Sequence, residues 1–329
     1  FALAQWMVLK APHVKVLGFA TVSGDFWQKE ATAYALRGVE IANRPDVPVV
    51  AGATYPLLNT EKRTERWESL YGKLVWKGAW MKQWVEKTNQ PLPPYHAANS
   101  VPDLPWGNPK TKAAPETAVS FMLRMVHQYP GQVSIIECGP MTNLALAQKL
   151  DPEFASLAKE LVYMGGSLNP QQKLNTPSAA QFAREFGNSP RREFNIRFDP
   201  EAASIVMHAP WKKIVMVPAD PSTETEMSEA FVKDITQSDT PVARIMRKSA
   251  NNFPLWDEIA AAVWLDPSLI RTSTDVYVDV NTAFDAQYGD ILSWSEGYQP
   301  RLDEQKEHVV LRVDVPRMKA LIKDLIARP

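Results

Sequence analysis

The chain is poor in cysteine and has no long apolar run. Cys138 is the only cysteine among 329 residues, which excludes an internal disulfide, and no Cys-x-x-Cys pair or Cys/His cluster offers a zinc site. No apolar segment reaches the roughly 18 residues that a membrane-spanning helix needs. The start, Phe1-Ala-Leu-Ala-Gln-Trp-Met7, has neither a basic region nor an initiating Met, so we expect the sequence to begin partway into a protein. The compartment stays open between the cytoplasm and export.

The chain also lacks a surplus of charge of either sign. Its 36 basic and 37 acidic residues are spread along the sequence without a basic block. This balance argues against a surface that follows nucleic-acid phosphates, and it favours a small or neutral substrate. An apolar content of 45% is enough to bury a substantial core, and the length fits one large domain or two smaller ones. We favour a single domain over residues 1–329.

Short apolar runs alternate with longer helical segments. We expect strands at Val14–Gly24, Val47–Ala51, Val133–Glu137, Leu161–Met164, Thr272–Val280, Ile291–Trp294 and His308–Asp314, and helices at Gln28–Asn43, Glu116–Tyr129, Thr142–Leu150 and Arg317–Ala327. This alternation predicts an α/β fold with an open, mostly parallel, twisted sheet flanked by helices. In such a fold the loops that follow the strands are the expected site.

Residues 55–115 break that alternation because they are rich in tryptophan and proline. A long irregular segment over a compact fold is typical of a lid, although a helical cap that packs on its tryptophans is an equal alternative. Trp76, Trp80 and Trp84 fall at helical spacing, which assigns them mainly to packing.

Two pairs of residues indicate chemistry. Asp257 follows Trp256 directly before the apolar run Ile259–Trp264, and an aspartate at the mouth of a buried helix is typical of a ligand or site residue. Glu193 and Asn195 lie two residues apart, so in an extended segment both side chains point the same way. A carboxylate and an amide on one face suit the hydroxyls of a sugar.

These segments together resemble the inosine-uridine preferring nucleoside hydrolase family. The resemblance runs from Phe1-Ala-Leu-Ala4 through Gly139-Pro-Met-Thr-Asn143, Met164-Gly-Gly166, Glu193-Phe-Asn195 with Asp199-Pro200, and Asp257, to the C-terminal helix. It implies an open α/β fold, one calcium ion at the bottom of the pocket, and cleavage of the N-glycosidic bond of ribonucleosides. The implied partner is a small-molecule nucleoside, with no nucleic acid and no membrane, and a homodimer or homotetramer is expected.

The resemblance also implies a set of metal ligands. Asp257 would give a carboxylate to the calcium and Cys138 its backbone carbonyl oxygen, both of which suit a hard cation, whereas a thiol would not. The side chain of Cys138 is expected to be a small buried group. The remaining calcium carboxylates and the aspartate that acts as general base are expected upstream of Phe1.

The ribose contacts follow from the same resemblance. Glu193, Asn195 and Met164 would hold the ribose, joined by an asparagine of the 169–175 loop, for which we choose Asn175 over Asn169. Asp25 matches a polar residue that closes the ribose side of the pocket. It could equally cap the helix that follows it, and the two roles are compatible.

The leaving-group side departs from the pattern of many members, which carry a histidine directly before the last calcium aspartate. Trp256 stands there, as it does in the purine-specific branch, where the base departs while stacked between two indoles. A π face stabilises a cationic ring, so stacking should assist protonation of the base. We choose Trp67 as the second indole, with Trp76, Trp80 and Trp84 as competitors. The alternative for Trp256 is a hydrophobic plug over the helix start.

The leading hypothesis is therefore calcium-dependent hydrolysis of purine ribonucleosides to free base and ribose, as part of nucleoside salvage. One alternative is a nucleoside- or sugar-binding protein on the same scaffold without catalysis. Another is a hydrolase of a different ribosyl compound.

Overall fold

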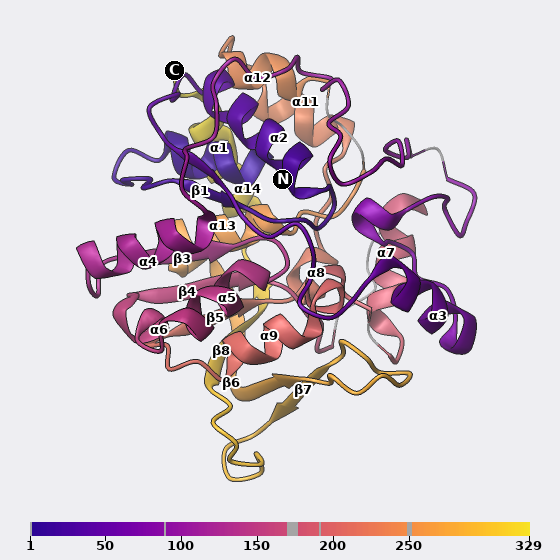
Figure 1. Ribbon diagram of the computed structural model, residues 1–329. Helices are drawn as coiled ribbons and strands as arrows, with labels where there is room; N and C mark the ends of the chain where they lie inside the picture. Colours follow the sequence, from indigo (N-terminus) through magenta and orange to yellow (C-terminus); the bar gives the residue numbers. More distant parts are fainter. Residues whose placement is uncertain (1, 89, 170–176, 191, 249–251) are drawn as a thin grey trace.

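Apolar strands and amphipathic helices alternate along the computed structural model, which describes residues 2–88, 90–169, 177–190, 192–248 and 252–329 (Figure 1). The strands are β1 (Phe19–Thr21), β2 (Val49–Ala51), β3 (Ser134–Glu137), β4 (Glu160–Met164), β5 (Ile214–Val217), β6 (Ile270–Val280), β7 (Ile291–Trp294) and β8 (Lys306–Val313). The helices of the first half are α1 (Ala2–Lys10), α2 (Gln28–Ile41), α3 (Glu61–Tyr71), the short 3₁₀ turn η1 (Gly78–Trp80), α4 (Ala118–Gln128), α5 (Thr142–Leu150) and α6 (Phe154–Leu157). Those of the second half are α7 (Pro177–Gly187), α8 (Phe194–Phe198), α9 (Pro200–Met207), α10 (Ala219–Ser222), α11 (Glu229–Ile235), α12 (Pro241–Met246), α13 (Asp257–Leu265), the 3₁₀ turn η2 (Pro267–Leu269) and α14 (Val315–Ala327).

The main sheet has six strands in the order β3-β4-β5-β8-β6-β7. The first four are parallel, with Leu161 of β4 beside Ile135 of β3 and Ile214 of β5. Strand β6 runs antiparallel to both β8 and β7. The prediction of an open, mostly parallel α/β sheet is confirmed.

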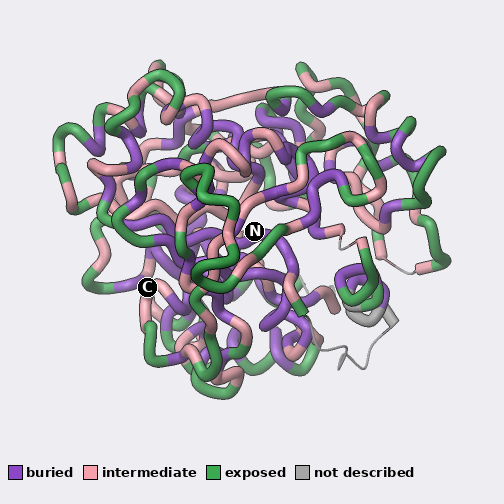
Figure 2. Tube along the Cα trace, turned by 90° about the horizontal axis from the view of Figure 1, so that it is seen from below, coloured by how far each residue is buried: buried purple, intermediate pink, exposed green. Residues whose placement is uncertain are grey.

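Side chains of the central strands alternate between two layers of helices. Val162 and Met164 of β4 pack with α1, α2 and α11–α14, whereas Leu161 and Tyr163 pack with α4, α5, α6 and α9. Because neighbouring residues of a strand point to opposite faces, each central strand contributes to both layers. The buried segments consequently run through the middle of the molecule (Figure 2). Within the described ranges, no helix has the length and apolar content to cross a lipid bilayer.

Strands β1 and β2 form a separate parallel pair, and a cavity of about 910 Å³ extends between β1 and β3. Residues 14–22 line one side of it and residues 132–140 the other. The strand predicted over Val14–Gly24 is therefore too long. Phe19–Thr21 pair with β2, and the N–H of Ser23 donates to the carbonyl of Ala53 at 3.1 Å, while the residues before Phe19 face the cavity.

The 55–115 segment is irregular as predicted, except for α3 and η1, in the part that the structure describes. No helix spans Trp76, Trp80 and Trp84, so the helical spacing of these residues was misleading. Prolines on both sides limit regular structure, and the chain instead follows the surface of α3 and α7.

A buried carboxyl group of the main sheet, that of Glu307, predicts a loss of stability at alkaline pH. Glu307 of β8 is fully buried, and one of its carboxylate oxygens accepts a hydrogen bond of 2.6 Å from the hydroxyl of Tyr163 in β4. Burial raises the pKa of Glu307 to about 8. Between the unfolded pKa and this folded pKa the native state holds a proton that the unfolded chain releases, so stability falls as pH rises through this window.

We expect the free energy of unfolding to fall by about 4 kcal/mol between pH 5 and pH 9 through Glu307, since each pKa unit corresponds to about 1.4 kcal/mol. Urea unfolding of the wild type and of Glu307→Gln at both pH values measures this contribution. The variant cannot ionise, so its free energy should fall less over the same range. Parallel pH dependences in the two proteins would contradict the prediction.

Candidate active site

Seven of the predicted site residues line the cavity that opens between β1 and β3. They come from the loops after β1 and β3, from the last residue of β4, and from the starts of α8 and α13 with their N-caps, and they are Asp25, Cys138, Met164, Glu193, Asn195, Trp256 and Asp257. Parallel strands place their carboxyl ends at one edge of the sheet, which explains why loops far apart in sequence meet here.

The loop after β1 carries Ser23 and Asp25, which have different tasks. The hydroxyl of Ser23 accepts the backbone N–H of Gln28, the first residue of α2, at 2.7 Å. Asp25 instead accepts a hydrogen bond from the indole N–H of Trp76. Of the two roles proposed for Asp25, the helix cap is wrong, because the N-cap position is Trp27. Burial raises the pKa of Asp25 to about 6, although the bond from Trp76 opposes the shift.

The turn after β3 ties the two sheets together. The side-chain amide of Asn143 donates to the carbonyl of Thr21 at 3.0 Å, and its oxygen accepts the N–H of Ala53 at 2.9 Å. A Cβ at Gly52 would come within 2.3 Å of that oxygen, so the close approach requires glycine. The Gly139–Asn143 motif therefore holds the turn that presents Cys138 to the cavity.

Two titratable groups at this turn face the cavity. Burial, reinforced by the carboxylate of Asp257, raises the pKa of the Cys138 thiol well above its usual range, which fits a role for its carbonyl oxygen rather than its sulfur. Glu137 accepts the N–H of Gly139 at 3.1 Å, and burial raises its pKa to about 8. Glu137 was missed as a site residue. Its position at the carboxyl end of a buried parallel strand was the available signal.

Asn195 lies in α8, so Glu193 and Asn195 are not both in the predicted extended segment. Glu193 is the N-cap of α8, and its carboxylate accepts the N–H groups of Asn195 at 2.8 Å and Ile196 at 3.0 Å. It also accepts the N–H of Gly166 at 2.8 Å. These capping hydrogen bonds stabilise a helical turn, so the residues after Glu193 are helical rather than extended. Burial outweighs these bonds and raises the pKa of Glu193 to about 7.

Asn195 and Met164 nevertheless meet at the cavity wall. The amide nitrogen of Asn195 donates to the carbonyl of Met164 at 3.0 Å and lies 3.5 Å from its sulfur. This contact joins α8 to the end of β4. It fixes the orientation of the Asn195 amide toward the cavity.

The start of α13 places a buried carboxylate beside an aromatic cluster. Asp257, the first residue of the helix, is 4% exposed, and burial raises its pKa well above the usual range, with further contributions from Glu258, Asp25 and Glu193. The ring of Trp256 meets the edge of Phe182 at 5.4 Å between centroids. Its indole N–H is buried and, among the described residues, has no hydrogen-bond partner.

The second indole at the cavity is not Trp67, and that prediction is wrong. Trp67 is 1% exposed, lies under the guanidinium of Arg197, and donates its indole N–H to the carbonyl of Asp285 at 2.7 Å, so neither face is open. Trp76 and Trp84 line the cavity instead and stack on each other with ring centroids 5.4 Å apart.

Trp80 is buried against Phe198, as its assignment to packing requires. Asn175, the asparagine chosen for the ribose, lies outside the described residues. Its competitor Asn169 is exposed, and its backbone N–H donates to Asp220 at 2.6 Å.

The cavity has the chemistry of a cation site without a complete set of ligands. Asp257 offers a carboxylate and Cys138 a backbone carbonyl, which are the hard oxygens that calcium prefers. Several carboxyl groups share this buried environment, and a cation would relieve their mutual repulsion. Across the ranges that the structure describes, however, no three His, Cys, Asp or Glu side chains are grouped to hold a metal ion.

Known proteins with similar sequences include nucleosidases and a nucleoside hydrolase. The family model described as inosine-uridine preferring nucleoside hydrolase matches residues 2–320. The probable uridine nucleosidase 1 of Oryza sativa subsp. japonica is 28% identical over 347 residues, covering 98% of this chain and 92% of that protein. The inosine-uridine preferring nucleoside hydrolase of Crithidia fasciculata is 24% identical over 332 residues, covering 96% and 90%.

Solved structures agree in fold. A plant nucleoside hydrolase superposes with a TM-score of 0.72 at 22% identity, covering 100% of this chain and 95% of that one. The purine-preferring ribonucleoside hydrolase from Gardnerella vaginalis gives a TM-score of 0.70 at 20% identity, covering 99% and 95%. With the family model matched over nearly the whole chain, the protein belongs to the inosine-uridine preferring nucleoside hydrolase family of N-ribohydrolases.

Proposed function

We propose that this protein hydrolyses the N-glycosidic bond of purine ribonucleosides, with calcium as its cofactor, to free base and ribose. The observation that carries the proposal is the joint lining of one cavity by a buried carboxylate, Asp257, and by the indoles of Trp76, Trp84 and Trp256. Carboxylates suit a sugar whose ring becomes cationic, and indoles suit a flat bicyclic base.

Carboxylates and amides serve the sugar. Cleavage develops positive charge on the ribose ring, which the negative field of Asp257 and Asp25 stabilises. Asn195, held by the carbonyl of Met164, orients a ribose hydroxyl. Asp257 and the carbonyl of Cys138 would hold the calcium. Calcium, when bound, supplies positive charge that orients the vicinal hydroxyls of the ribose.

The indole rings that line the cavity are proposed to stack on the leaving base. The only one of the five histidines that lines the cavity is His13, which is exposed on the turn after α1. No imidazole is therefore packed beside Trp256, where a leaving base would need an acid. Stacking on indole faces stabilises a protonated purine, which lowers the barrier to its departure.

The test is release of product from inosine and uridine, with calcium and after its removal by a chelator. We expect hypoxanthine and ribose from inosine, with kcat/KM at least about tenfold above that for uridine, since the larger ring gains more stacking. Chelation should abolish the reaction and calcium should restore it. A preference for uridine would overturn the purine assignment. Binding of inosine without release of hypoxanthine would favour a binding protein.

A further inference from the structure

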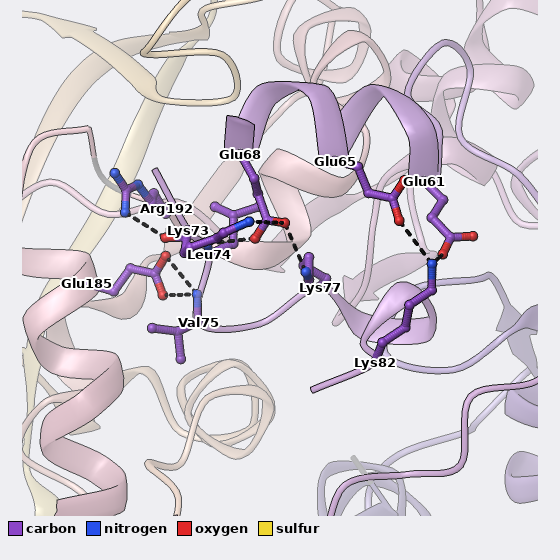
Figure 3. A network of polar contacts seen from close by, with 10 residues as sticks. All are labelled: Glu61, Glu65, Glu68, Lys73, Leu74, Val75, Lys77, Lys82, Glu185 and Arg192. Carbon is purple, nitrogen blue, oxygen red and sulfur yellow. Dashed lines mark hydrogen bonds and ion pairs between the residues drawn. The ribbon is translucent and has the colours of Figure 1, made fainter. Parts of the chain in front are cut away.

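The loop that carries Trp76, residues Lys73–Lys77, is held by a buried carboxylate of α3. Glu68 accepts the backbone N–H of Leu74 at 3.0 Å with one oxygen and the ammonium of Lys77 at 3.0 Å with the other (Figure 3). Its side chain is 3% exposed. We call residues Lys73–Lys77 the indole loop.

A second carboxylate reaches the same loop from α7. Both oxygens of Glu185 lie on the N–H of Val75, at 2.9 and 3.2 Å (Figure 3). Arg192 completes the contact by donating to the carbonyl of Lys73 at 3.0 Å. Glu185 also lines the cavity and is 8% exposed. Burial raises the pKa of Glu185 to about 7, while the N–H of Val75 and the charges of Arg192 and Arg197 act in the opposite direction and stabilise the carboxylate.

The residues directly after the indole loop are hydrogen-bonded to the loop that follows β1. The N–H of Ala79 donates to the carbonyl of Gly24 at 2.9 Å. Gly78 adopts φ +56°, and a Cβ there would lie 2.2 Å from the same carbonyl, so glycine permits the close approach. Trp76 is thereby held between α7 on one side and Asp25, which accepts its indole N–H, on the other.

Helix α7 contacts Trp256 directly and holds the backbone beside Trp76. Phe182 meets Trp256 edge-on at 5.4 Å, and Glu185, three residues later, holds the residue before Trp76. Residues three apart lie on one face of a helix. One helical face therefore fixes Trp256 through an aromatic contact and Trp76 through a hydrogen bond.

We propose that Glu185 is a positioning residue that, through the N–H of Val75, sets the place of Trp76 relative to Trp256 and so selects for bicyclic bases. This inference rests on the proposed function, because it concerns how the purine base is positioned in the cavity. Glu185 acts through the loop and the indole rather than by contact with the reacting bond.

The test compares Glu185→Ala with Glu185→Gln. The alanine variant leaves the N–H of Val75 without its acceptor, so KM for inosine should rise about tenfold or more, with a smaller change for uridine. The glutamine variant keeps an acceptor oxygen and should stay within about threefold of wild type. The stacked Trp76–Trp84 pair gives a readout without substrate, because its excitonic couplet in the far-ultraviolet circular dichroism should weaken in the alanine variant only.

Glu304→Ala is the matched control. Glu304 is likewise buried and accepts two loop N–H groups, those of Arg301 and Leu302 at 2.6 Å each, but it does not line the cavity. Neither KM nor the couplet should change in this variant.

If Glu185→Ala does not fold, Glu185→Asp repeats the test, because one methylene less withdraws the oxygens from Val75. An unchanged couplet and an unchanged KM in folded Glu185→Ala, or in folded Glu185→Asp if the alanine variant does not fold, would overturn the proposal. Wild type inactive on every nucleoside would instead refute the proposed function.

Discussion

Replacing Asp257 by asparagine should reduce hydrolysis of inosine by at least about a thousandfold, as expected when a catalytic site loses a charge that holds its cation. Asp257 is buried at the start of α13 among other carboxyl groups. The amide keeps the size of the side chain but removes the negative charge. The variant should therefore fold, yet retain little calcium after dialysis, as measured by elemental analysis beside the rate assay.

Asp266→Asn supplies the comparison at the other end of the same helix. Asp266 follows α13 and accepts the N–H of Ser268 at 3.0 Å, and it does not line the cavity. Its replacement should leave the calcium content and the rate unchanged. Full activity or full calcium content in Asp257→Asn would show that the cation is held elsewhere.

Trp256→Ala should lower kcat/KM for inosine by about 5- to 150-fold, the range that corresponds to about 1–3 kcal/mol of base stacking. The indole lines the cavity beside Phe182 and Phe253, where a base could stack on it. The loss should be much smaller for a riboside whose leaving group departs without protonation, such as p-nitrophenyl riboside. Steady-state rates on the two substrates separate base activation from sugar binding.

Trp211→Phe tests the general cost of removing an indole. Trp211 packs against Phe154 in the layer of α4, α5, α6 and α9 and does not line the cavity. This replacement should lower the free energy of unfolding without changing the ratio of kcat/KM for inosine to kcat/KM for p-nitrophenyl riboside. Equal losses on both substrates in Trp256→Ala would assign Trp256 to packing, as a plug over the helix start.

The fold was largely predictable because each buried strand is a short apolar run between helical segments. Leu161–Met164 and Ile291–Trp294 were found within one residue of their observed bounds. Ile214–Val217, a central strand of four apolar residues, was missed. The strand at Val14–Gly24 was overextended because β-branched residues favour a strand even where the described part of the chain places no strand beside them.

The candidate site was predictable in its residues but less so in their geometry. Seven predicted residues line one cavity, because motifs that follow parallel strands converge at one edge of the sheet. Trp67 could not be separated from Trp76 by sequence, since both lie in a segment whose path depends in part on Glu185, which is 110 residues from the N–H of Val75 that it accepts. Such long-range contacts leave no local pattern.

The single thiol of the chain, that of Cys138, lies where a ligand bound in the cavity would change its accessibility. Cys138 lines the cavity, and no other cysteine competes with it for a reagent. Its raised pKa makes alkylation slow at neutral pH and faster in alkaline solution. The rate at which the native chain takes up a thiol label therefore reports how well the cavity is occupied, without any engineered probe.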